Sequence, residues 1–205
     1  DSLDRDSDGL ADMDKDLQDR ARAAMFSLGA TYPELSGYYP QPKGLLFPAF
    51  LSVQNLSGIY SPFTIEANYN SAMVSYNLPF TICHELSHLR GFMQEEEANF
   101  IGFLACVNAD DTAFNYSGYL LGWIYATNEL YEVDYDTFEE IYNRLSDNVK
   151  ADLSANSSFW KRYDSKVAEV SGQINDHYLK ANGQSDGIKS YDRMVDLMVA
   201  WFRSK

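Results

Sequence analysis

Apolar positions recur at helical spacing along most of the chain. Side chains three and four residues apart lie on one face of a helix, so this period predicts amphipathic helices. The segments that carry it are residues 10–28, 94–108, 111–133, 136–145, 158–179 and 190–202. Ser146 or Asp147 is expected to cap one more short helix, because both side chains can accept a hydrogen bond from the first helical turn.

The stretch 31–69 has a different pattern. Its prolines at positions 33, 40, 42, 48 and 62 limit helix formation. Residues 50–53 and 60–68 are the best strand candidates, because they combine aromatic and β-branched residues between turn signals. We therefore expect an α+β fold that is mainly α-helical, with a small sheet.

Composition indicates a single globular domain of 205 residues, divided into an acidic N-terminal segment with the first helix (1–30) and a main part (31–205). Hydrophobic residues make up 45% of the chain and aromatic residues 15%, unlike a disordered protein. The net charge is −14, and an acidic surface repels phosphate backbones. Nucleic acid is therefore excluded as an expected partner.

Two of the three histidines lie four residues apart, in His84-Glu85-Leu86-Ser87-His88. On a helix both imidazoles lie on one face and can reach one metal ion, while Glu85 lies beside them as a candidate general base. Pro79 favours a helix start just before the motif, and Gly91 favours its end. The alternative is a pair of half-buried histidines with no ligand.

Three glutamates, Glu95 to Glu97, begin the next predicted helix. Acidic residues in a first turn are favoured by the helix dipole, which explains them without any metal. A catalytic zinc site, however, has three protein ligands and one open position. One of these carboxylates is therefore a candidate for the third ligand.

The stretch from His84 to Leu104 resembles the Glu-type zincins, or gluzincins, in which a glutamate after H-E-x-x-H completes the zinc site. More closely, H-E-L-S-H-L-R-G-F followed by E-E-E-A-N-F resembles a bacterial family of membrane-anchored zinc-dependent peptidases, catalogued as a domain of unknown function. The similarity extends to residues 60–68, 78–81 and 178–184, and to Gly187, Ser190 and Tyr191. It implies a zincin-like fold, one Zn²⁺ per chain, and a peptide or protein substrate.

The resemblance also implies roles for single residues. It makes Glu95 the third ligand and places Asn99, one turn later, as the partner that holds Glu95. Glu97 is the alternative ligand. Only six residues separate His88 from Glu95, which departs from the long insertions of many Glu-type zincins.

The expected reaction is hydrolysis of a peptide bond by water, with Glu85 taking the proton and passing it to the leaving amine. The developing oxyanion needs a hydrogen-bond donor. The candidates are Tyr178 and Tyr191, which match the family, and His177 and Arg90. The alternative function is a catalytically silent zinc-containing domain that binds peptide or acts as a sensor ectodomain.

Zincins commonly place an edge strand beside the active-site helix, where a substrate backbone can pair with it. We expect residues 63–68 to form this edge, with Glu66 facing the cleft. The alternative for Glu66 is an exposed strand carboxylate.

Asp4, Asp6 and Asp8, followed by Gly9, resemble the start of a calcium-binding loop. Position twelve of that loop is Lys15 instead of the bidentate glutamate, so an acidic linker is the alternative. Ca²⁺ at this loop is the second metal prediction.

Cys83 and Cys106 both lie in apolar helical contexts, which favours buried free thiols over a disulfide. No signal peptide or membrane-spanning segment is expected within the chain. The resemblance implies a membrane helix upstream of Asp1, and hence an extracytoplasmic domain at the cell membrane that meets the bilayer only through that anchor.

Overall fold

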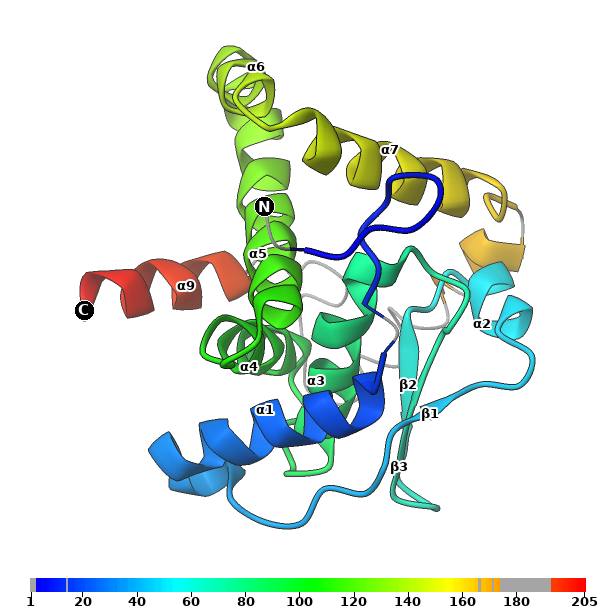
Figure 1. Ribbon diagram of the computed structural model, residues 1–205, viewed down its shortest axis with the longest axis vertical. Helices are drawn as coiled ribbons and strands as arrows, with labels where there is room; N and C mark the ends of the chain where they lie inside the picture. The colour runs from blue at the N-terminus through cyan, green and yellow to red at the C-terminus, as the bar shows by residue number, and fades with distance from the viewer. Residues whose placement is uncertain (1–2, 14, 166, 171, 174–192) are drawn as a thin grey trace.

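Helices dominate the fold, and a small sheet lies along one side of them (Figure 1). The structure is a computed structural model that describes residues 3–13, 15–165, 167–170, 172–173 and 193–205. The helices are α1 (Leu17–Thr31), α2 (Ala49–Val53), α3 (Leu78–His88), α4 (Glu95–Val107), α5 (Thr112–Val133), α6 (Tyr135–Asn143), α7 (Asp147–Lys161) and α9 (Arg193–Arg203), with 3₁₀ turns η1 (Pro33–Leu35) and η2 (Ser75–Asn77). The expected α+β, mainly α-helical class is confirmed.

Helix α3 is the centre of the molecule. It contacts α1, α4, α5 and both longer strands, and every residue from Leu78 to His88 except His84 is buried. Pro79 occupies the first turn, where its missing N–H is not needed, and Gly91 follows the helix with a φ of 90°. The H-E-x-x-H motif therefore lies on a helix that packs against both the other helices and the sheet.

The sheet has three short strands in the order β1-β3-β2: β1 (Lys43–Gly44), β2 (Gly58–Ser61) and β3 (Glu66–Tyr69). Strand β1 runs parallel to β3, and β2 pairs antiparallel with β3 in a register that joins Gly58 to Tyr69. The predicted strand at 60–68 is therefore a hairpin. The edge expected at 63–68 is wrong, because β3 is central and β2 forms the edge beside α3.

Three other predicted boundaries also change. Residues 50–53 belong to helix α2 instead of a strand, because Pro48 starts a helical turn there. The first helix begins at Leu17 instead of residue 10, since residues 3–13 form a loop closed by an Arg5–Ala11 bridge. Helix α7 continues through Ser158 to Lys161, so no helix starts at Ser158.

The N-terminal loop packs onto α5 and α7 through Asp152. This carboxylate is fully buried, accepts a hydrogen bond from the Ala11 N–H at 2.9 Å, and pairs with Arg5 at 3.3 Å. Tyr116 of α5 donates its hydroxyl to the same carboxylate. Ala11 and Met13 are buried in a second small core beside the main one. Segment 1–30 therefore packs together with the rest of the fold in its described residues.

Cys83 and Cys106 are buried free thiols, as predicted. Among the described residues, the helices are all too short or too polar to cross a lipid bilayer.

Candidate metal centre

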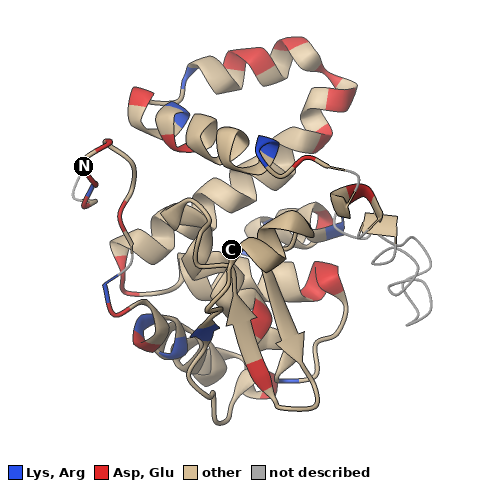
Figure 2. Cartoon of the chain, turned by 90° about the vertical axis from the view of Figure 1, so that its right-hand side faces the viewer, with Lys and Arg blue, Asp and Glu red and all other residues tan. Residues whose placement is uncertain are grey.

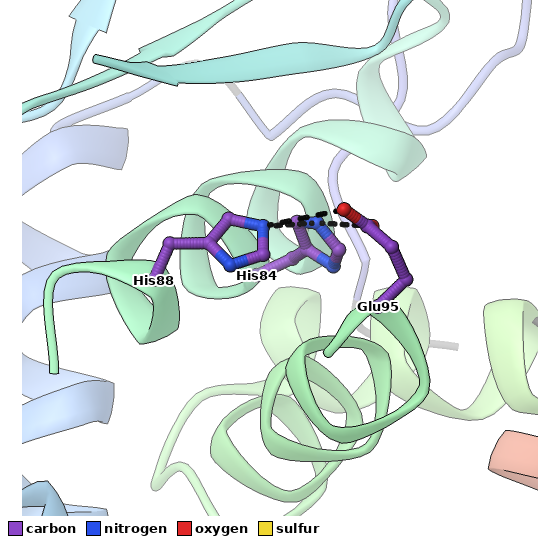
Figure 3. A group of neighbouring side chains, drawn as sticks. All are labelled: His84, His88 and Glu95. Carbon is purple, nitrogen blue, oxygen red and sulfur yellow. Dashed lines mark hydrogen bonds and ion pairs between the residues drawn. The ribbon is translucent and has the colours of Figure 1, made fainter. Parts of the chain in front are cut away.

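His84, His88 and Glu95 converge on one point between α3 and α4 (Figure 3). The two Nε2 atoms are 3.1 Å apart, His84 Nε2 lies 3.4 Å from Glu95 Oε2, and His88 Nε2 lies 3.8 Å from Glu95 Oε1. Tetrahedral zinc, with bonds of about 2.0–2.2 Å, separates neighbouring donors by roughly 3.3–3.6 Å. These donor spacings fit a single small cation.

The chemistry of the donors agrees with that fit. Two imidazole nitrogens and one carboxylate oxygen are a common set for catalytic zinc. In the described part of the chain, His84, His88 and Glu95 are the one group of three such residues whose ligand atoms lie within 4.8 Å of one another. This chain therefore has a group that could hold a metal ion.

The pKa values of the two histidines shift in opposite directions. Burial lowers the pKa of His84, but the neighbouring Glu95 and Glu85 outweigh it and raise the net value. Burial and the nearby His84 lower the pKa of His88 to about 4.

The ring orientation of His88 is fixed from outside the motif. Its Nδ1 lies 2.7 Å from the carbonyl oxygen of Phe92, which can only accept, so Nδ1–H donates. The lone pair is then on Nε2, which points at the other donors. Tyr60 of β2 packs against the same imidazole, with ring centroids 6.0 Å apart. Sequence reasoning missed both contacts, because they depend on the tertiary fold.

Glu85 lies beside the group, with Oε1 3.9 Å from His84 Nε2. It is only 5% exposed, and burial raises its pKa to about 8, partly offset by His84. A carboxylate in such a site has a strong tendency to take up a proton, which is the property of a general base.

Asn99 is buried, and its side chain lies close enough to His84 to help raise the pKa of that imidazole. Its Nδ2 and the Nδ1 of His84 are both buried, and neither has a hydrogen-bond partner among the described residues. The structure thus places Asn99 beside His84, and the predicted contact between Asn99 and Glu95 stays a prediction.

The other glutamates of this turn point elsewhere. Glu97 is exposed and lies outside the group, whereas Glu96 is buried and pairs with Arg193 of α9 at 3.6 Å. Between the two candidates for the third ligand, the geometry favours Glu95.

Two further candidates, Arg90 and Glu66, have contacts outside the metal group. Arg90 donates to the Ser36 carbonyl at 3.1 Å. Glu66 is half-buried on β3 and pairs with Lys43 of β1, and its position facing the cleft stays a prediction. Tyr178, Tyr191 and His177 lie outside the described residues. Asp6 uses Oδ1 to accept from the Asp8 and Leu10 N–H groups, and calcium binding by Asp4, Asp6 and Asp8 stays a prediction.

Fold and site together define a mainly helical domain with a candidate His-His-Glu metal centre. The chain belongs to the family described as "Protein of unknown function (DUF3810)", whose family model matches residues 1–199. No curated protein matches the chain, and no solved structure matches it. The expected membership of a domain-of-unknown-function family is thereby confirmed, whereas peptidase activity and membrane anchorage stay predictions.

Proposed function

We propose that this domain is a zinc-dependent metallopeptidase. The observation that carries the proposal is the convergence of His84, His88 and Glu95 with Glu85 buried alongside them. A purely structural zinc site has four protein ligands and no use for a buried general base. In the described part of the chain, no other His, Cys, Asp or Glu joins this group.

His84, His88 and Glu95 would hold the ion. When bound, zinc would lower the pKa of a water molecule and polarise a substrate carbonyl. Glu85 would take the proton from the attacking water and deliver it to the leaving amine. Since burial favours the protonated carboxyl, Glu85 can hold that proton between the two steps.

The edge position of strand β2 favours a polypeptide substrate. It forms one edge of the sheet and lies against α3, so an extended peptide could pair with its backbone next to the metal group. The chain segment that contains β2 carries little charge: from Leu35 to Ile65 the one charged residue is Lys43, and Glu66 follows on β3 (Figure 2). Ile59 and Phe63 are exposed there. These features favour peptides with neutral, apolar side chains.

The decisive test is Glu85→Gln. Glutamine keeps the size and polarity of the side chain but cannot take up a proton, so the variant should retain about one zinc per chain and lose hydrolysis by at least ~10²-fold. Zinc is measured by elemental analysis, and hydrolysis with a peptide library. Glu97→Gln, on the exposed side of α4, is the matched control and should keep both.

Full hydrolysis by Glu85→Gln would refute the peptidase mechanism. Zinc retention without hydrolysis of any peptide by the unmodified protein would instead favour the peptide-binding or sensor domain. Tyr178 and Tyr191 remain proposed oxyanion donors, and Tyr→Phe at each should lower kcat while the zinc content stays unchanged. An extracytoplasmic location behind an upstream membrane helix is proposed from the family resemblance alone.

A further inference from the structure

The backbone of β2 lies directly against the side chain of Glu85. A Cβ atom at position 58 would be 2.4 Å from Glu85 Oε1 and 2.8 Å from both Cδ and Cγ. Contacts under 3.0 Å essentially never occur for real Cβ atoms. The φ of Gly58 is outside the left-handed region, so the backbone conformation does not require glycine. Glycine is required because Glu85 occupies the space that a Cβ atom at position 58 would need.

Neither side of this contact can move easily. Gly58 is paired with the buried Tyr69 in the sheet, and the preceding Ser57 carbonyl accepts a 2.8 Å hydrogen bond from the Asn70 N–H. Glu85 belongs to the buried helix α3, and the overlap includes Cγ, so rotating the carboxylate tip alone would not relieve it. An added methyl group must therefore displace most of the Glu85 side chain.

We infer that Gly58 is a positioning residue, which seats the Glu85 carboxylate beside the metal group by presenting bare backbone to it. The inference rests on the proposed function only for its effect on catalysis. The metal-binding atoms of His84, His88 and Glu95 are absent from the atoms closest to a Cβ at Gly58. Gly58→Ala should thus disturb the base and leave the metal ligands in place.

The contact itself is tested by a double-mutant cycle on thermal stability. Gly58→Ala should lower the Tm by about 5 °C, as overpacking does in a domain of this size. In a Glu85→Ala background the methyl group enters vacated space, so the same change should lower the Tm by less than half as much. Equal losses in both backgrounds would overturn the inference.

The catalytic role is tested in the zinc-loaded protein. Displacing a reacting group by about 1 Å can cost on the order of 10²-fold, so Gly58→Ala should lose that factor in kcat/KM and shift the acidic limb of the pH–rate profile, with about one zinc retained. Gly44→Ala in β1 is the control. Its Cβ would meet Ser71 and Tyr69 at 3.3 Å and lies on another strand, so activity should be unchanged.

The proposed peptidase function and the positioning role of Gly58 can be refuted separately. If the unmodified protein hydrolyses no peptide, the proposed function fails, and the stability cycle still decides whether Gly58 holds Glu85. If the protein is active and Gly58→Ala keeps full kcat/KM with an unchanged pH profile, the positioning role is refuted. Loss of zinc from Gly58→Ala would refute it as well, since the damage would then extend to the ligands.

Discussion

At the residue scale, Glu95 turns a pair of histidines into a three-donor group. The histidines alone lie on one helix and would form only half of a site, whereas Glu95 comes from α4 and faces both Nε2 atoms. Its side chain is 18% exposed, so one side of the group remains open. A carboxylate from a second helix also makes the site depend on how α3 and α4 pack.

The position of Glu95 at the histidines gives a prediction that distinguishes it from Glu97 in the same turn of α4. Glu95→Ala should reduce zinc affinity by at least ~10²-fold, because a ligand is lost, while Glu97→Ala should leave it unchanged, because Glu97 is exposed and outside the group. Competition with a chromophoric chelator measures both affinities. The opposite ranking would make Glu97 the ligand.

The residues of the site differ in how far the sequence could predict them. His84, Glu85 and His88 form a local motif, since one helical turn brings them together whatever the rest of the fold does. Glu95 required a family resemblance to choose among three glutamates. The carbonyl of Phe92 and the missing side chain of Gly58 have no sequence signal, because their roles depend on contacts across the fold.

At the element scale, Asp111 joins the start of α5 to α1. It accepts hydrogen bonds from the Ala113 and Phe114 N–H groups and binds Arg20 with both oxygens at 2.7 Å. Burial raises the pKa of Asp111, but the bonds from Arg20 and the helix N-terminus together lower it below its usual 3.8. The ionised form is therefore favoured in the folded protein.

The sign of the pH effect follows from that shift. A lowered folded-state pKa adds stability that is complete well above pH 3.8 and is lost as the pH falls through the folded-state value. Asp111→Asn keeps an acceptor for the helix N-terminus but loses the ion pair with Arg20, so it should lower the free energy of unfolding at pH 7 by about 1 kcal/mol. Urea unfolding should show this difference shrinking below pH 4.

Asp110→Asn, at the exposed neighbouring position, should show no such difference at either pH. A deficit of Asp111→Asn that stays constant from pH 7 to pH 3 would contradict the linkage.

Asp152 of α7 forms hydrogen bonds with both the N-terminal loop and α5. Replacing it with alanine would leave Arg5, the Ala11 N–H and the Tyr116 hydroxyl without their shared acceptor. Breaking a buried ion pair costs about 3 kcal/mol or more, so the Tm should fall by roughly 6–12 °C. Differential scanning fluorimetry measures this, with the exposed Glu139→Gln as control. A fall no larger than that of Glu139→Gln would show that the loop is not held in this way.

The elements show why the boundaries were harder to predict than the helices themselves. The long helices α4 and α5 were predicted to within a residue or two, because their apolar period continues over several turns. Residues 50–53 are too few to show a period, and Pro48 decided in favour of α2. The hairpin of β2 and β3 was predicted as one strand, since the turn at 62–65 contains apolar residues.

At the scale of the whole molecule, the core is built from apolar side chains of several helices and the sheet. The main cluster of buried side chains joins α1, α3, α4 and the sheet, and includes Leu28, Ile82 and Phe103. Small zinc domains lack such a core and unfold when the metal is removed. We therefore expect this protein to fold without zinc and to gain stability when zinc binds.

The size of that gain follows from mass action. Zinc at 100 times its Kd adds about 2.7 kcal/mol if it binds only the folded state, which corresponds to a rise in Tm of roughly 5–11 °C for a chain of this length. The rise should vanish in His88→Ala and after chelation, and circular dichroism should show the same helix content with and without metal. An equal rise in His88→Ala would place the bound zinc elsewhere, and loss of helix on chelation would mean that the metal holds α3 and α4 together. His88 lies on α3 and Glu95 on α4. The rise in Tm on adding zinc therefore tests whether the packing of these two helices brings the donors together.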